Sequence, residues 1–180
     1  MLYYYYDRIV SDEDAMSNTK VIDNLRRVEI FTGLLDEELL EVAELCTAVR
    51  VPAGKTIFKE GDGGDELYII HDGNVRVMIN TRAPDGTFAP STINLLYSGQ
   101  SFGEMILLNN ATRSATVVAV DPTTLIVMHE PAFRQLCESN PRIGYVVIRN
   151  LAQDLAYKLR SSNLLLRGNI RWQQGELGKS

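Results

Sequence analysis

Residues 101–117 read SFGEMILLNNATRSATV, and this stretch holds the residue types of an anion-binding turn. Gly103 lets the backbone approach a ligand closely, because glycine has no Cβ atom. A short helix that begins at this glycine exposes its first N–H groups, which attract anions. Arg113 follows Glu104 by nine positions and offers a planar group that can hold two phosphate oxygens at once. The stretch therefore predicts a phosphate site.

The neighbouring residues indicate what else such a ligand carries. Glu104 can accept hydrogen bonds from a sugar hydroxyl, as an acidic residue does for ribose in dinucleotide sites. Ser114 and Ala115 are small enough to leave their backbone N–H groups open to a phosphate. One anionic group, one sugar hydroxyl and little room describe a compact nucleotide.

Two segments of this stretch resemble the phosphate-binding cassette of the cyclic nucleotide-binding domain family. They are Phe102-Gly103-Glu104 and, after eight residues, Arg113-Ser114-Ala115-Thr116-Val117. The family includes the regulatory subunit of protein kinase A, cyclic-nucleotide-gated channels and the bacterial catabolite activator protein. The resemblance implies a 3′,5′-cyclic nucleotide as ligand, and Ser114 in place of threonine favours cyclic AMP over cyclic GMP. The ligand contacts that it implies are Phe102, Gly103, Glu104, Met105, Arg113, Ser114 and Ala115.

The resemblance also implies contacts to the base from one strand and from the last helix. Ile93 and Asn94 lie on the strand that flanks the base in the family. For the helix, an ungapped alignment places Lys158–Leu159 over the base. One further helical turn instead places Ser162 and Asn163 there, and the heptad pattern of the helix favours this second alignment.

Short β-prone segments recur at regular spacing between residues 47 and 129, mostly without helices between them. This pattern argues against a parallel α/β sheet and favours a β-roll or barrel. The resemblance implies an α+β fold, an eight-stranded antiparallel β-roll of jelly-roll type with helices at both ends. The expected parts are an arm at 1–19, helices at 20–46, the roll at 47–129, helices at 130–166 and a tail at 167–180.

Three local patterns predict details of this fold. Asp72-Gly73 is a two-residue hairpin signal between the strands expected at 67–71 and 74–81. Asp36 is expected to cap the second helix, in which Leu40 belongs to the buried stripe. Residues 82–90 are expected to form a loop.

The last helix carries a short heptad seam, with apolar or small residues at alternating steps of four and three. Such a seam predicts pairing with a second copy of the chain, or packing on the chain's own roll. Because residues 167–180 hold no recognisable DNA-reading or catalytic module, we expect a regulatory sensor domain that acts through a homodimer or a separate effector protein. The seam consists of Ile148, Ala152, Leu155, Leu159, Ser162 and Leu166.

Bulk properties limit the partners. The net charge of −5 gives no electrostatic attraction to nucleic acid or anionic lipid, and no apolar run reaches membrane-spanning length. Cys46 and Cys137 are far apart and suit a reducing cytoplasm. His71 and His129 are isolated in the sequence and predict no metal site, so no cofactor is expected beyond the nucleotide ligand.

Two alternatives stand beside the sensor interpretation. Residues 99–103 match the G-x-S-x-G pattern of a serine hydrolase with Ser101 as nucleophile, but only His129 lies downstream and no oxyanion-loop motif is present, so we expect no enzyme. The other alternative is an interaction protein that has the fold and binds no nucleotide. Such domains usually lose the arginine or the glutamate of the cassette, and this sequence keeps both Glu104 and Arg113.

Overall fold

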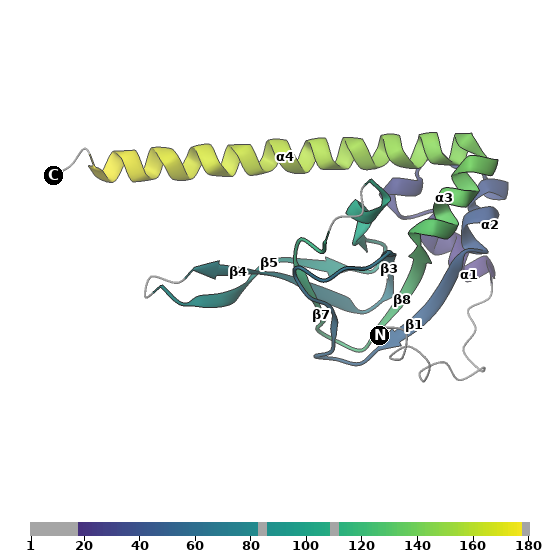
Figure 1. The fold of residues 1–180 in the computed structure, drawn as a ribbon, viewed down its shortest axis with the longest axis horizontal. Helices are drawn as coiled ribbons and strands as arrows, with labels where there is room; N and C mark the ends of the chain where they lie inside the picture. Colours follow the sequence, from purple (N-terminus) through teal and green to yellow (C-terminus); the bar gives the residue numbers. More distant parts are fainter. Residues whose placement is uncertain (1–17, 83–85, 109–111, 178–180) are drawn as a thin grey trace.

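A computed structural model describes residues 18–82, 86–108 and 112–177 of the 180-residue chain (Figure 1). Side chains are described from residue 21 to residue 160 within these ranges, except at 158. The strands are β1 (Cys46–Val51), β2 (Thr56–Phe58), β3 (Glu66–Asp72), β4 (Asn74–Arg82), β5 (Phe88–Tyr97), β6 (Ser101–Phe102), β7 (Thr116–Ala119) and β8 (Thr123–His129). The helices are α1 (Asn18–Leu25), η1 (Glu29–Phe31), α2 (Asp36–Ala43), η2 (Glu104–Leu107), α3 (Glu130–Ser139) and α4 (Pro141–Leu177).

The eight strands in the described part of the chain form two four-stranded antiparallel sheets, in the orders β1-β8-β3-β6 and β2-β7-β4-β5. Alternate residues of a strand point to opposite sides of its sheet, and the central strands β3 and β8 of the first sheet are buried on both sides. On β8, Leu125 and Val127 face the second sheet, while Ile126 and Met128 pack against the helices. A continuous apolar run such as residues 125–128 is therefore typical of a strand at the centre of this sheet. The expected α+β fold with a β-roll is confirmed.

The hairpin expected at Asp72-Gly73 is wrong, because β3 and β4 belong to different sheets. Each strand already has two other neighbours, β8 and β6 for β3, and β5 and β7 for β4. Gly73 has a φ of +87°, and a Cβ atom there would lie 2.7 Å from Oγ1 of Thr123. A glycine is therefore needed at residue 73, because the turn there packs closely against Pro122 and Thr123 at the start of β8. The loop expected at 82–90 is also shorter, since β4 continues to Arg82 and β5 begins at Phe88.

The N-terminal helices differ from the sequence prediction in two details. Leu35, not Asp36, is the N-cap residue of α2, and its backbone N–H donates to the carboxylate of Glu38 at 2.8 Å. The carboxylate of Glu38 thus accepts a backbone N–H at the start of α2, and the helix needs no polar side chain at the N-cap position itself. Leu40 is exposed, whereas Leu39, Val42 and Ala43 are buried.

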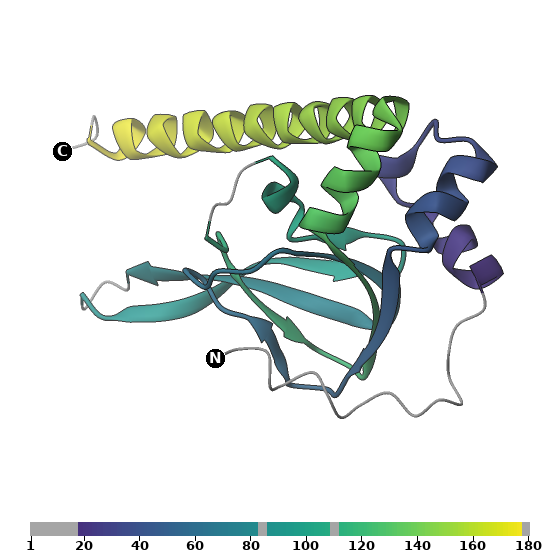
Figure 2. The same cartoon turned by 45° about the vertical axis from the view of Figure 1, so that its right-hand side comes forward.

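Helix α4 begins at a sharp turn after α3 and runs across the top of the roll (Figures 1 and 2). Its buried face consists of Ile143, Val146, Val147 and Leu151, at spacings of three and four residues. The helix continues through the segment expected to be a tail and ends at Leu177. Between Leu166 and that end two glycines, Gly168 and Gly175, disfavour helix, and each costs only about 1 kcal/mol.

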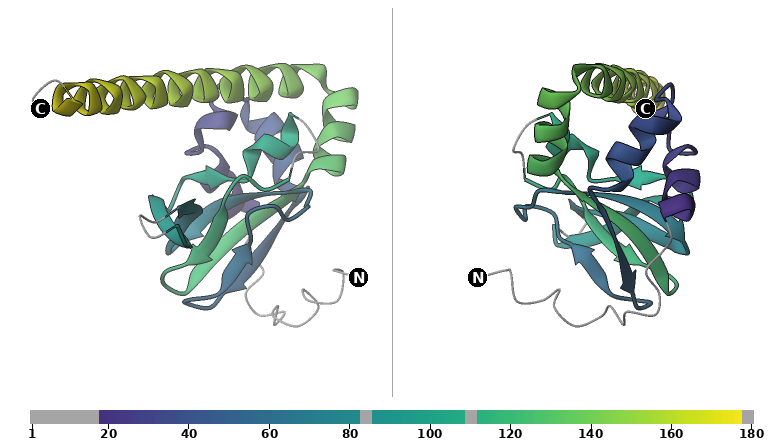
Figure 3. Two further views of the ribbon diagram at one scale, coloured as in Figure 1. Left: turned by 60° about the vertical axis from the view of Figure 1, so that its left-hand side comes forward. Right: turned by 90° about the vertical axis from the view of Figure 1, so that its right-hand side faces the viewer.

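Polar contacts fasten the first turns of α4 to the N-terminal helices. Arg142 donates to the carboxylate of Glu38, and the side-chain amide of Asn150 donates to the carbonyl oxygens of Ile30 and Thr32. The later turns of α4 extend beyond the roll (Figures 1 and 3). Among the described helices, none combines the length and the apolar composition that crossing a membrane requires.

Candidate functional site

A cavity of about 550 Å³ opens between the roll and α4. This volume lies within the range of small-molecule sites, about 300–1,000 Å³. Its wall includes the turn from β6 into η2, residues 112–115, the strands β4 and β5, and one residue of α4. Segments from across the sequence thus meet around one concave surface.

Gly103 has two physical reasons to be a glycine. Its φ is +77°, which places it in the left-handed region just before η2 begins at Glu104. A Cβ atom at this position would also lie 2.7 Å from Nη1 of Arg113. The absent side chain therefore makes room for the arginine beside the first turn of η2.

Arg113 is held by a buried network. Its side chain is 5% exposed, Nη1 donates to the carbonyl oxygen of Glu66 at 2.9 Å, and Nη2 donates to the carboxylate of Glu66 at 2.7 Å. The guanidinium carbon lies 4.3 Å from the ring centre of Phe58 and 5.6 Å from that of Tyr68, within cation–π range. The carboxylate that pairs with the cassette arginine is therefore Glu66, a residue that the sequence analysis did not select.

One of the three nitrogen atoms of this guanidinium makes no hydrogen bond among the described residues. This atom, Nε of Arg113, is buried. Buried polar groups nearly always have partners, and an unpartnered one requires an explanation. An anion beside the guanidinium would accept a charge-assisted bond, which is among the stronger hydrogen bonds.

The glycine-rich loop at residues 60–65 positions this arginine from the other side. The backbone N–H of Arg113 donates to the carbonyl oxygen of Asp62, and the N–H of Gly61 donates to the carbonyl oxygen of Arg113, each at 2.8 Å. A Cβ atom at Gly64 would lie 2.7 Å from Nη2 of Arg113. The loop is thus a support of the site.

All seven cassette residues selected from the sequence line the cavity. Phe102 and Ala115 are buried, and the ring of Phe102 stacks on that of Tyr68 at a centroid distance of 5.1 Å. Met105 and Ser114 are exposed to the opening. The other members are Gly103, Glu104 and Arg113.

The residues selected for the base are placed less completely. Ile93 and Asn94 of β5 line the cavity. Ser162 and Asn163 belong to α4, but their side chains, like that of Lys158, lie outside the described residues. Among the described side chains of α4, Asp154 lines the cavity. Neither alignment of the helix selected it, although it lies one turn before the first alternative.

Charges of both signs line the cavity away from Arg113. Arg27, which precedes η1, and Glu29, the first residue of η1, join Glu104 and Asp154 in the wall. Sequence reasoning missed Arg27 and Glu29, since nothing local to them signals a site. The arrangement provides one buried cation for an anion and several polar groups for the rest of a ligand.

The hydrolase alternative finds no assembled triad in the described residues. Ser101 lines the cavity, but His129 is absent from its lining, and Nδ1 of His129 lies 3.2 Å from the carboxylate of Asp65. A serine nucleophile needs a base within hydrogen-bond reach.

Comparison with known proteins agrees with this geometry. The family model for the cyclic nucleotide-binding domain matches residues 48–140, which include the cassette. The cyclic AMP receptor protein of Thermus thermophilus is 35% identical over 137 residues, which are 76% of this chain and 60% of that protein. Glutaminase 1 of Bradyrhizobium diazoefficiens is 35% identical over 134 residues, 74% of this chain and 20% of that protein.

A solved structure extends the likeness to the fold. The crystal structure of a cyclic nucleotide-binding domain from Methylobacillus flagellatus has a TM-score of 0.69 and 27% identity, and the match covers 81% of this chain and 79% of that one. This chain thus spans 60% of the first curated relative and 20% of the second. On its sequence, its roll and its cassette, the chain belongs to the cyclic nucleotide-binding domain family.

Proposed function

We propose that the chain binds a 3′,5′-cyclic nucleotide, cyclic AMP before cyclic GMP, and serves as a regulatory sensor domain. The observation that carries this proposal is the position of Arg113, a buried cation whose Nε has no partner among the described residues, in the lining of the cavity that the cassette residues share. A cyclic phosphate is an anion small enough to enter there.

We assign each part of the nucleotide to residues that line the cavity. The phosphate contacts Arg113 and the N–H groups of Ser114 and Ala115, and the ribose hydroxyl donates to Glu104. The base then lies toward Ile93 and Asn94 on β5, with α4 above it. In this arrangement Ser162 and Asn163 cap the base, as the heptad alignment of α4 predicts.

Helix α4 is the element through which binding would be communicated. Leu155 packs against the core, whereas Ile148 and Leu159 of the same heptad seam are exposed, the latter to 63%. An exposed apolar seam on a helix favours pairing with a second copy. We therefore propose a homodimer through α4, with a separate effector protein as a further partner and the cytoplasm as the location, where the two free cysteines stay reduced.

Isothermal titration calorimetry with cyclic AMP, cyclic GMP and 5′-AMP tests the proposal. We expect saturable heat with both cyclic nucleotides, tighter binding of cyclic AMP, and weak binding of 5′-AMP. No heat with either cyclic nucleotide at millimolar concentration would show that the fold is present without the binding function. Light scattering on the same samples reports whether the chain is a dimer.

A further inference from the structure

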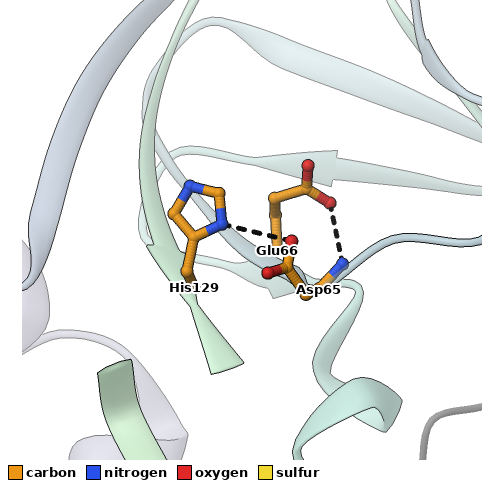
Figure 4. A group of neighbouring side chains, drawn as sticks. All are labelled: Asp65, Glu66 and His129. Carbon is orange, nitrogen blue, oxygen red and sulfur yellow. Dashed lines mark hydrogen bonds and ion pairs between the residues drawn. The ribbon is translucent and has the colours of Figure 1, made fainter. Parts of the chain in front are cut away.

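A histidine and two carboxylates meet at the edge of the roll, outside the nucleotide cavity (Figure 4). His129 ends β8, and Glu66 begins β3 directly opposite it in the antiparallel register. Asp65 immediately precedes Glu66. In Figure 4 the imidazole of His129 is directed at the carboxylate of Asp65, and the carboxylate of Glu66 is directed at the backbone N–H of Asp65, although 64 residues separate Asp65 from His129. This separation explains why the sequence showed two isolated histidines.

The distances suit a metal ion. One ligand atom from each side chain can be chosen so that all lie within 4.8 Å of one another. Nδ1 of His129 and Oδ1 of Asp65 are 3.2 Å apart. Two ligands on a tetrahedral Zn²⁺, with bonds of about 2.0–2.1 Å, are separated by about 3.4 Å. The group therefore needs small rotations of its side chains, and not a backbone movement, to enclose an ion.

Backbone contacts fix the group in place. The N–H of Glu130 donates to the carbonyl oxygen of Asp65 at 2.7 Å, and the N–H of Asp65 donates to the carboxylate of Glu66 at 3.1 Å. The side chains of His129 and Asp65 are about half exposed, at 52% and 50%. An ion could thus enter from solvent and keep water in its remaining positions.

We propose that Asp65, Glu66 and His129 form a binding site for a divalent transition-metal ion, with Zn²⁺ as the representative. One imidazole nitrogen and two carboxylates are a mixed donor set that Zn²⁺ accepts, whereas Mg²⁺ and Ca²⁺ prefer oxygen ligands alone. The thiols compete poorly for the ion. Burial raises the pKa of Cys46 to about 12 and also raises that of Cys137, so both stay protonated at neutral pH.

The site shares a ligand with the nucleotide site. Glu66 contacts the proposed ion, and its Oε2 also accepts the bond from Nη2 of Arg113. An ion on this carboxylate withdraws negative charge from Arg113 and adds positive charge nearby. Both effects favour an anion at Arg113, so metal and cyclic nucleotide should bind cooperatively. This coupling, unlike the metal site itself, rests on the proposed function.

The test titrates the full chain with Zn²⁺ alone and follows binding by competition with a chromophoric chelator. We expect one ion per chain, a dissociation constant at least tenfold weaker in His129→Gln and in Asp65→Asn, and no competition from millimolar Mg²⁺. His71→Gln is the matched control, because His71 is the other of the two histidines in the chain and should leave Zn²⁺ binding unchanged. Circular dichroism verifies that each variant is folded.

The coupling is measured by titrating cyclic AMP with and without saturating Zn²⁺. We expect about three- to tenfold tighter binding with the ion, and the same factor for Zn²⁺ in the presence of nucleotide, because linkage is reciprocal. Equal Zn²⁺ affinity in the parent chain and His129→Gln overturns the metal site. Normal Zn²⁺ binding with an unchanged nucleotide affinity overturns the coupling alone. Normal Zn²⁺ binding with no nucleotide binding overturns the proposed function and leaves the metal site standing.

Discussion

Replacing Arg113 with alanine removes two hydrogen bonds to Glu66 and the contact with the ring of Phe58. Breaking one side of a buried ion pair costs about 3–5 kcal/mol. Because the Glu66 side chain is 21% exposed and water can reach it, we expect a loss of about 2–3 kcal/mol in the free energy of unfolding. Arg113→Ala also loses the charge-assisted bond to the phosphate, which contributes about 1.5–3 kcal/mol to the binding free energy. Cyclic AMP should therefore bind about 12- to 150-fold more weakly.

Urea unfolding and calorimetry measure the two effects separately, and a second change separates their causes. Glu66→Gln in the Arg113→Ala background removes the uncompensated carboxylate charge, so part of the stability should return while the affinity stays low. Arg113→Lys keeps the charge without the planar fork and should bind with intermediate affinity. If Arg113→Ala binds cyclic AMP as tightly as the parent chain does, the phosphate lies elsewhere and the reasoning from the buried Nε is refuted.

Gly103→Ala should cost about 1–3 kcal/mol in urea unfolding, because φ is +77° and the new Cβ meets the guanidinium, whereas Gly63→Ala, with nothing within 4 Å, should change little. Burial alone would raise the pKa of Glu38, but the bonds from Arg142 and from the backbone, together with the charge of Arg142, lower it below 4.5. The stabilisation from Glu38 is therefore present above pH 4.5 and is lost as pH falls through the lowered pKa. When the melting temperature is measured at decreasing pH, it should fall less steeply in Glu38→Gln than in the parent chain. Leu151→Ala, at a fully buried position of α4, should lower the free energy of unfolding by about 2–5 kcal/mol, and an unchanged melting temperature would contradict the packing described for that helix.

The cassette was predictable from sequence because its parts are close together in the chain. Gly103 and Arg113 are ten positions apart, and the chemistry of each can be read locally. Glu66 lies 47 positions before Arg113, and a strand-initiating glutamate after a glycine-rich loop carries no signal of its partner. The choice of Glu66 depends on the pairing of β3 with β6 and β8, which local patterns do not specify.

The errors in the fold have a similar cause. Asp72-Gly73 is a genuine turn signal, but a turn motif does not determine whether the strands it joins share a sheet. Strand pairing is decided by competition with distant strands, and β3 pairs with β8 in preference to β4. The end of α4 was misplaced for another reason. The heptad seam predicts the helix only as far as Leu166, but the residues around Gly168 and Gly175 are compatible with a helix, which therefore continues past both glycines to Leu177.

The 37 residues of α4 make a rod of about 55 Å, since each residue adds about 1.5 Å. Arg142 and Asn150 fasten its first turns to the N-terminal helices, and Leu151 and Leu155 pack against the core, so these described contacts hold the rod near its N-terminal end. Beyond Leu155 the helix extends for about 33 Å, so a rotation of about 5° there moves its far end by about 3 Å. A small change in the angle of the fastened part is therefore amplified at the far end of α4 to a displacement of about half a helical turn.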